Sequence, residues 1–543
     1  MSGVTTTAQR PTTSRRVTIA TRLGGALTGV LTAAVALGVA ELVAGTISRE
    51  SSPVIAVGSA FIDLTPRPLK DFAIRTFGED DKNALLIGTG VVLVLFAIAI
   101  GLLTLRRRRY GVAGVAVFGL VGVAAALTRP GAGIADALPS VVGPVAGIGA
   151  LLMLAKALPR GPAPVRDADR PTAADADAPT PMTSPTGFDR RRFLFTGGAA
   201  LAVAVAAGGV GRALMRRFDV SAAREALRLP APASPAPALP AAVQLSVREI
   251  TPFTTPIDSF YKVHTALVLP QVEPDSWKLR IHGRVANPIT LSFDDLLERD
   301  LIERDITISC VSNEVGGELA GHARWLGAPL KTLLDEVRPE SGADQIVTKS
   351  ADGWTCGTPT AICRDGRDAM LAVGMNGAPL PVVHGFPVRM IVPGLYGYVS
   401  ATKWIVDMEL TSFADFDPYW VRRGWTAQAP IKTASRIDTP RPFAKPKKGS
   451  TVTVAGVAWA QHRGIDKVEV RVDGGAWQTA TLAAEANIES WRQWSWQWPV
   501  GEPGGHTIEC RATDRTGEPQ TERRATPFPN GATGWHSVVV TVE

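Results

Sequence analysis

Four cysteines carry the most distinctive side-chain chemistry in this chain of 543 residues. None stands in a CxxC pair, which argues against a zinc site. Cys356 and Cys363 are close enough in sequence to pair in an oxidising compartment, or to remain two buried thiols. Cys310 follows segment 305–309, which predicts a strand with Cys310 at its end. A thiolate there would be a soft metal ligand, but a single cysteine at a strand end is also a common core residue.

The elements around Cys310 have to position it. Apolar runs after residue 246 are short and bounded by Gly, Pro and Asp, which is typical of strands. Segment 277–281 alternates with period two and predicts a strand, and Ser292 with Asp295 predicts a capped helix start. We therefore expect a mixed α+β domain over 246–425.

A different texture begins near residue 426. Alternating runs with turn residues between them predict a β-sandwich of immunoglobulin type over 426–543. The tryptophans at alternate positions of one run would share a face and pack in the core. The runs are 451–459, 467–472, 494–498 and 537–542.

Several short motifs follow one another between residues 258 and 536. They are Asp258–His264, Ile308–Asn313, Ala323–Gly327, Asp352–Thr355, Met375–Pro381, His384–Arg389, Val392–Gly397, Lys403–Trp404 and Asn530–His536. In this order they resemble the sulfite oxidase family of molybdopterin-dependent oxidoreductases, in a membrane-anchored bacterial form. The resemblance covers about 250–543, and it implies a multi-domain chain with an α+β molybdopterin domain before the sandwich.

The resemblance also implies roles for individual residues. Cys310 would be the protein ligand of a molybdenum ion that is otherwise held by one pterin dithiolene and oxo groups. Arg324 matches an arginine near the metal, where a cation stabilises developing charge. Trp354 stands where relatives have a tyrosine close to the metal. The residues expected to hold the pterin are Tyr261, His264, Asn313, His384, Arg389 and Lys403.

Two departures from the family pattern concern the substrate. Relatives that oxidise sulfite have an arginine after the asparagine of the cysteine motif, whereas Asn313 is followed by Glu314. Trp354 replaces the tyrosine hydroxyl of those relatives. A reversed charge beside the site of a dianion opposes its binding. We therefore expect a substrate other than sulfite.

The first half of the chain reads as a membrane region. A bilayer core of about 30 Å needs roughly 20 apolar residues in a helix. The formal net charge is +7, but many basic residues flank apolar runs as topology signals, which argues against a nucleic-acid partner. Spans that meet the requirement are predicted at 23–45, 84–105, 111–127, 138–158 and 193–211.

Arginine and lysine set the predicted orientation. Basic clusters precede the first span, separate the second from the third and follow the fourth, so all three should be cytoplasmic. The fifth span then leaves the rest of the chain outside the cell membrane. Before it, Asp189 to Leu194 resembles a twin-arginine export motif, a pathway for folded, cofactor-loaded proteins.

Other cofactors and partners follow from what the sequence holds. All seven histidines lie at 264 or later, so the first spans cannot form a bis-histidine haem site. We expect molybdenum-molybdopterin without haem, a small oxyanion or an S- or N-oxide substrate, and an external electron carrier such as a membrane redox partner. Glu41 is either functional or a snorkelling side chain near a helix end.

The predicted organisation has six parts. We expect a lipid bilayer around the first and the third part, and a homodimer that forms through the last. They are transmembrane helices at 1–160, a polar linker at 161–189, the export motif and fifth helix at 190–227, a Pro/Ala linker at 228–245, the catalytic domain at 246–425 and the sandwich at 426–543. The alternatives are an inactive surface-anchored binding protein and, less in keeping with the apolar spans, a transporter.

Overall fold

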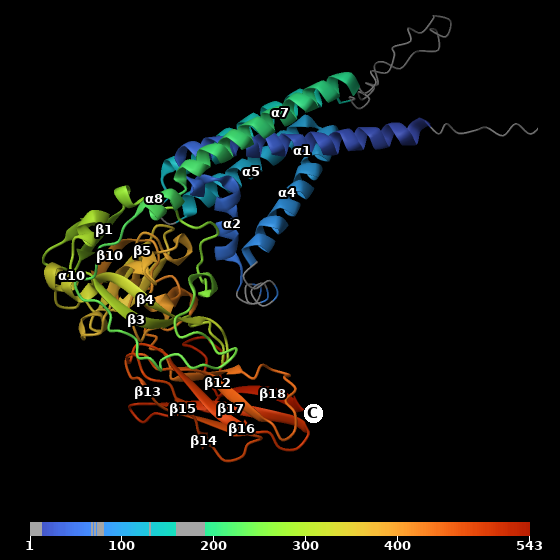
Figure 1. The fold of residues 1–543 in the computed structure, drawn as a ribbon. Helices are drawn as coiled ribbons and strands as arrows, with labels where there is room; N and C mark the ends of the chain where they lie inside the picture. The colour runs from blue at the N-terminus through green and yellow to red at the C-terminus, as the bar shows by residue number, and fades with distance from the viewer. Residues whose placement is uncertain are drawn as a thin grey trace, which may run out of the picture. The chain divides into compact units, whose positions relative to one another are not determined.

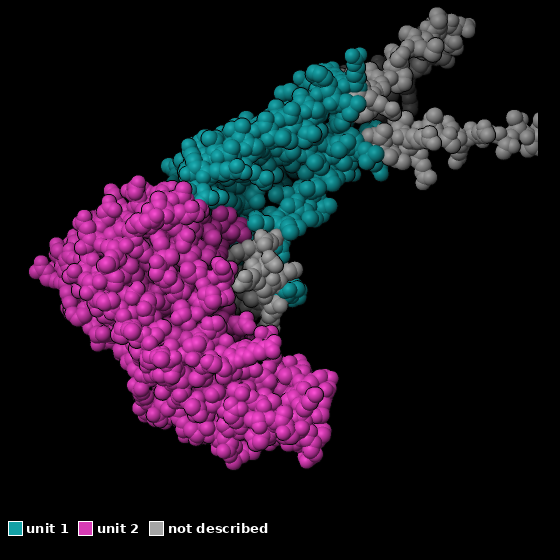
Figure 2. All heavy atoms as spheres, in the orientation of Figure 1, with its two compact units in different colours: residues 1–219 teal, residues 220–543 magenta. Residues whose placement is uncertain are grey.

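The computed structural model describes residues 13–66, 81–129, 132–158 and 190–543, together with Leu69, Phe72 and Thr76. The chain divides into two compact units, 1–219 and 220–543 (Figure 2). The predicted polar linker, and Asp189 of the export motif, lie outside the described residues.

Unit 1 is helical, and five of its helices are long and apolar enough to cross a membrane. The predicted spans match them, except that the fourth prediction runs three residues past the end of α6. α2 was not predicted, because an apolar stretch of this length is too short to cross a bilayer at about 1.5 Å per residue. The helices are α1 (Thr13–Ile47), α2 (Pro53–Leu64), α4 (Asp81–Arg106), α5 (Arg108–Thr128), α6 (Leu138–Ala155) and α7 (Arg190–Met215).

Close backbone approaches between these helices define their directions. A Cβ added at Gly29 would strike the Ala97 backbone, and one at Gly25 would meet Leu105, so α1 and α4 are antiparallel. Gly38 lies against Ala204 and Gly45 against Gly211, so α1 and α7 are parallel. Small residues allow such approaches where a bilayer gives helices little hydrophobic drive to associate.

The basic segment between α4 and α5 lies at the end of the bundle where α6 ends. Arg108 follows α4 and donates from its guanidinium to the Ala155 carbonyl at the end of α6, at 3.0 Å. The same end holds the start of α7, because α7 runs parallel to α1. At the opposite end Ser52 donates a hydrogen bond of 2.5 Å to Glu41. The alternation of spans from which the orientation was predicted is therefore present in the bundle.

The first part of unit 2 contains two five-stranded sheets, and short helices connect some of their strands along the chain (Figure 1). One has the order β2-β1-β10-β5-β6 and the other β3-β4-β7-β8, with β9 paired to β7. Ser292 and Asp295 form the predicted capping box at the start of α9. The elements are β1 (Lys278–Gly283), β2 (Ile289–Ser292), α9 (Phe293–Leu297), β3 (Ile302–Ser309), β4 (Ala320–Pro329), α10 (Leu330–Val337), β5 (Gln345–Ser350), β6 (Thr355–Pro359), β7 (Met370–Met375), β8 (Ala378–Pro379), β9 (Arg389–Ile391) and β10 (Ile405–Thr411).

The Pro/Ala segment before these sheets packs along β3. Ser234 forms a parallel bridge with Ile302, and the Ala236 amide donates to Glu303. The segment is extended, as its composition predicts, but it is part of the surface of the folded unit.

Two four-stranded antiparallel sheets complete unit 2, in the orders β11-β12-β16-β15 and β14-β13-β17-β18 (Figure 1). Trp494 and Trp498 are buried between them and Trp496 packs at the edge, as the alternation predicts. The strands are β11 (Ala434–Thr439), β12 (Thr451–Trp459), β13 (Ile465–Val472), β14 (Gln478–Thr479), β15 (Thr481–Leu482), β16 (Arg492–Pro499), β17 (Gly504–Asp514) and β18 (His536–Val542).

Asp514 at the end of β17 is expected to stabilise this sandwich in a pH-dependent way. Burial opposes ionisation, but hydrogen bonds from Thr516, Arg463 and Thr433 prevail and lower the pKa of Asp514 to about 2. A carboxyl whose pKa is lowered on folding stabilises above its unfolded pKa of about 4, and this contribution disappears as the pH falls towards 2. Asp514→Asn should lower the free energy of unfolding at pH 7 by at most about 2 kcal/mol.

Urea unfolding of the full chain, followed by tryptophan fluorescence, checks this prediction. All thirteen tryptophans lie at 277 or later, so the signal reports unit 2 alone. The difference between wild type and variant should shrink from pH 4 to pH 2. A difference that stays constant over this range would contradict the assignment.

Candidate active site around Cys310

Cys310 lies directly after β3, in a loop held by its own backbone. Its amide donates to the Leu319 carbonyl at 2.9 Å, which closes the loop between β3 and β4. Its thiol is half-buried and accepts a hydrogen bond from the Ser312 amide at 3.4 Å. The predicted strand therefore delivers the sulfur to a fixed position. All four cysteines, Cys310 included, are free thiols.

Asn313 braces the same loop. Its amide donates to the Cys310 carbonyl at 3.1 Å, and its side-chain oxygen accepts from the Leu319 amide at 2.8 Å. The asparagine thus acts on the conformation of the cysteine loop, which is the contribution the structure shows for this predicted cofactor residue.

The C-terminal sandwich supports the loop from the other side. Arg436 of β11 donates to the Gly317 carbonyl at 2.8 Å. Gly316 has a φ of +80°, and a Cβ at this position would strike the ring of His536 in β18. Glycine is required there for both reasons. The loop that carries Cys310 is therefore fixed by both parts of unit 2.

Arg389 is the most unusual charge near Cys310. It starts β9, is 2% exposed, donates to the His384 carbonyl at 3.1 Å and lies 5.1 Å from the centre of the Trp325 ring. Its Nε has no hydrogen-bond partner, and no carboxylate forms an ion pair with it among the described residues. Burial lowers the pKa of Arg389 to about 10. A buried cation without an anion is costly, so the site is suited to an anionic ligand.

The turn at His384 brings further basic groups to Arg389. A Cβ added to Gly385, whose φ is +112°, would lie 3.0 Å from Cβ of Arg389 and 3.1 Å from Cβ of Lys403. The Lys403 ammonium donates to the Val383 carbonyl at 2.9 Å. Burial, and then the charges of Lys403 and Arg389, lower the pKa of His384 to about 3, and its Nε2 is buried without a partner. A neutral histidine and two cations thus line one turn.

The predicted residues of the opening motif join this cluster at its edge. Tyr261 stacks on Phe260 with ring centres 5.2 Å apart. Burial raises the pKa of Tyr261 far above its usual value, Cys310 adds to this effect, and Arg389 opposes it. Its hydroxyl therefore stays protonated. His264 contacts the Ala266 carbonyl through Nδ1 at 3.0 Å, and its ring centre lies 6.0 Å from that of Trp404.

Arg324 is not brought to this cluster. It pairs across the sheet with Asp305, and their side chains form an ion pair of 2.7 Å. Asp305 precedes Cys310 by five residues along the strand, which is about 16 Å at 3.3 Å per residue. The family pattern predicted that Arg324 is a cation near the metal. In this structure its guanidinium forms an ion pair with the buried carboxylate of Asp305.

Trp354 belongs to the turn between β5 and β6, in the other sheet. The turn touches the Lys403–Trp404 segment, because the Ala351 amide donates to the Trp404 carbonyl at 2.8 Å. The indole Nε1 of Trp354 is buried and has no hydrogen-bond partner. The replacement of tyrosine by tryptophan therefore leaves one unused donor here.

Tyr396, and Lys432 beside it, were not predicted as site residues. Tyr396 is close enough for Cys310 to raise its pKa, after burial as the main cause, to about 12. Its hydroxyl faces the backbone of Gly531, whose carbonyl accepts from the Lys432 ammonium at 2.7 Å. Tyr396 stands in a recognised motif and could have been proposed, whereas Lys432 has no local signal.

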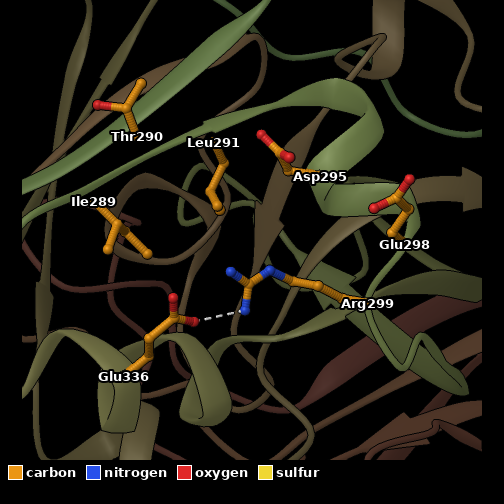
Figure 3. Close-up of a pocket in the computed structure, with 7 residues that line it drawn as sticks. All are labelled: Ile289, Thr290, Leu291, Asp295, Glu298, Arg299 and Glu336. Carbon is orange, nitrogen blue, oxygen red and sulfur yellow. Dashed lines mark hydrogen bonds and ion pairs between the residues drawn. The ribbon is translucent and has the colours of Figure 1, made fainter.

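A separate depression on unit 2 does not involve these residues. It is lined by β2, α9 and α10, and its main polar feature is an ion pair of 2.8 Å between Arg299 and Glu336 (Figure 3). None of the predicted site residues lines it, so we do not consider it part of the active site.

The donor set around Cys310 fits one metal–thiolate bond and an anionic organic cofactor. Among the residues that the structure describes, no three His, Cys, Asp or Glu side chains gather as a metal site. A metal at Cys310 would thus take its other ligands from a non-protein group, and Arg389 and His384 provide unpartnered nitrogen atoms for its polar parts.

Comparisons with known proteins agree with this geometry. Residues 266–420 match the family described as "Oxidoreductase molybdopterin binding domain". The mitochondrial sulfite oxidase of Homo sapiens is 30% identical over 313 residues, which cover 48% of this chain and 56% of that protein. The chain thus spans about half the length of the curated relatives it matches first. An uncharacterised oxidoreductase of Bacillus subtilis is 29% identical over 171 residues, covering 31% of this chain and 81% of that protein.

Among solved structures, the sulfane dehydrogenase SoxCD of Paracoccus pantotrophus has a TM-score of 0.47 and 22% identity, and covers 53% of this chain and 83% of its own. The matched family segment holds Cys310, His384, Arg389 and Lys403. Residues 266–420 therefore match a molybdopterin-binding oxidoreductase domain, and over about half of its length the chain is similar to sulfite oxidases.

Proposed function

We propose that this chain is a membrane-anchored, extracytoplasmic molybdenum-molybdopterin enzyme that transfers an oxygen atom and two electrons to or from a small compound. The observation that carries the proposal is the buried guanidinium of Arg389, which has no carboxylate partner and lies beside His384 and Lys403. A binding protein without a cofactor would have no reason to keep this cation buried.

Each residue of the cluster has a role in this proposal. Cys310 is the thiolate ligand, and Asn313 fixes the loop that presents it. Arg389, His384 and Lys403 hold the anionic pterin, with Tyr261 as a protonated, neutral donor. When bound, the molybdenum cofactor supplies the two-electron couple and accepts or donates the oxygen atom.

The membrane half supports anchoring and orientation. The basic segment between α4 and α5, at the end of the bundle where α6 ends, favours that end as cytoplasmic, which leaves the end of α7 and the catalytic unit outside. Export through the twin-arginine route, an immunoglobulin type for the C-terminal sandwich and dimerisation through it belong to the same proposal. An external carrier, with a membrane redox partner as the first candidate, exchanges the electrons.

The metal and pterin content of the purified full-length chain tests the proposal. Production in a host with the cofactor pathway should give about one molybdenum and one pterin per chain. Folded protein that contains neither would exclude the enzyme and favour the alternative, an inactive surface-anchored binding protein that uses its C-terminal sandwich.

Sulfite is expected to be a poor substrate. Glu314, two residues past the hydrogen-bonded Ser312, is exposed in the Cys310 loop and would repel a dianion. Wild-type enzyme should show no steady-state turnover at micromolar sulfite, whereas Glu314→Arg should lower the KM for sulfite by about 10- to 100-fold, from the Coulomb energy of a few kcal/mol near a surface.

Glu318→Arg is the matched control for charge. It makes the same change at another exposed position of the same loop, so it separates a local effect from a general one. Equal effects of the two variants, or efficient sulfite oxidation by the wild type, would contradict this expectation.

A further inference from the structure

The membrane unit contains an apolar cavity of about 150 Å³. Residues of α1, α2, α4, α5 and α6 line it, and no charged residue is among the lining residues that the structure describes. The hydroxyl-bearing lining residues are Thr32, Thr89 and Ser140. The cavity reaches from the middle of α1 towards the end where α2 and the start of α6 lie, because Ala40, Pro53 and Ser140 also line it.

Two of these hydroxyls are buried without a partner. Thr32 and Ser140 are each 2% exposed, and neither side-chain oxygen forms a hydrogen bond. Hydroxyls in apolar helices usually bond to the carbonyl one turn earlier. Thr28 does so with Gly24 and Thr104 with Ile100, each at 2.8 Å. An unsatisfied buried hydroxyl is costly, so a ligand with acceptor atoms in this cavity would be favoured.

We propose that this cavity binds the head ring of a membrane quinone. An apolar cavity of about 150 Å³ is large enough for one six-membered ring. The carbonyl oxygens of a quinone are acceptors for the hydroxyls of Thr32 and Ser140. A lipid acyl chain would leave both hydroxyls unsatisfied, and a charged ligand would find no counter-charge among the described lining residues.

A bound quinone also balances the reaction proposed for unit 2, and only this step rests on that function. When the substrate gains the oxygen atom of one water, two electrons and two protons are released. The quinone takes up the two electrons and the two protons and becomes a quinol. When an S- or N-oxide is reduced, the quinol supplies the same electrons and protons and water is the product.

Binding of radiolabelled decylubiquinone to the full-length protein in phosphatidylcholine nanodiscs tests the site. We expect saturable binding of about one molecule per chain. The double variant Thr32→Val, Ser140→Ala should bind at least about tenfold more weakly. Its thermal stability should stay equal or rise, because each substitution removes an unpartnered hydroxyl.

Thr28→Val is the matched control. It makes the same substitution one turn earlier in α1, at a hydroxyl that bonds within the helix and lies outside the cavity, so binding should be unchanged. Ala33→Phe keeps both hydroxyls but fills the space and should abolish binding. Cys310→Ser should bind quinone like the wild type, which separates this site from the proposed catalytic function.

Three results from the wild type and the double variant, and one from the control, would overturn the proposal. The first three are the absence of saturable binding, wild-type affinity in the double variant, and a retained phospholipid that decylubiquinone does not displace. Equal weakening by Thr28→Val would also overturn it, because the effect would then not depend on the cavity.

Discussion

Replacing Arg389 with methionine is expected to empty the cofactor site without unfolding the domain. Arg389 is 2% exposed, and among the described residues its guanidinium has only a carbonyl and an aromatic ring as partners, so the protein without cofactor loses little when the charge is removed. A charge-assisted hydrogen bond to an anion contributes about 1.5–3 kcal/mol. The loss of one such bond should weaken cofactor retention by roughly 10- to 150-fold.

The effects of Arg389→Met on cofactor content and on the stability of the cofactor-free protein have opposite signs and can be measured separately. Molybdenum and pterin content should fall in Arg389→Met made with the cofactor pathway. Urea unfolding, followed by tryptophan fluorescence in protein made without the pathway, should show an unchanged or higher free energy of unfolding, since replacing a buried charge with an apolar side chain is often neutral or stabilising.

Arg324→Met is the matched control. Arg324 is paired with Asp305, a carboxylate whose side chain is 4% exposed, so its removal should destabilise unit 2 by about 3–5 kcal/mol. The cofactor should remain bound. If Arg324→Met instead empties the site while Arg389→Met does not, the cation near the metal is the one that the family pattern indicated, and our assignment of Arg389 is wrong.

Local patterns were sufficient to predict the position of the cysteine. The alternation of 305–309 fixes a strand with Cys310 at its end, because side-chain period and strand conformation are coupled within a few residues. Ser292 and Asp295 identify a helix start for the same reason. The sequence also located the five apolar helices, since length and composition alone decide whether a helix can cross a bilayer.

The character of the site could not be predicted in this way. That Arg389 lacks a carboxylate, and that Arg324 has one, depends on which strands become neighbours. Lys432 and Gly531 approach Tyr396 only through the docking of the C-terminal sandwich. The unpartnered hydroxyls of the cavity likewise follow from helix packing, because a threonine hydroxyl in a helix normally donates to the carbonyl one turn earlier.

The docking of the sandwich gives the cysteine loop its rigidity. Arg436 forms an ion pair of 2.7 Å with Asp438 and donates to the Gly317 carbonyl, so one buried cation joins the sandwich to the loop. These contacts fix the backbone of the loop that carries Cys310. If Cys310 is the ligand that we propose, such pre-organisation lowers the cost of metal binding.

Cys310→Ser is expected to reduce turnover by more than about 100-fold, because even residues that only orient a ligand contribute about 10- to 100-fold. A serine oxygen is a harder donor than a thiolate and is mismatched to the soft sulfur environment expected for this metal. The fold should be retained, since the side chain is half-buried and its one hydrogen bond comes from the Ser312 amide. Loss of the sulfur-to-metal charge-transfer absorption, with molybdenum and pterin measured on the same sample, checks the assignment.

Cys363→Ala provides the control for cysteine chemistry in general. Cys363 is fully buried in the core of the same domain, where burial raises the pKa of its thiol. The Cys363→Ala substitution should therefore change the stability of the domain but not the metal spectrum. If Cys310→Ser keeps the absorption spectrum and turnover of the wild type while Cys363→Ala loses both, Cys310 is not the ligand. If neither substitution changes them, neither Cys310 nor Cys363 is the ligand, and our assignment of Cys310 is wrong.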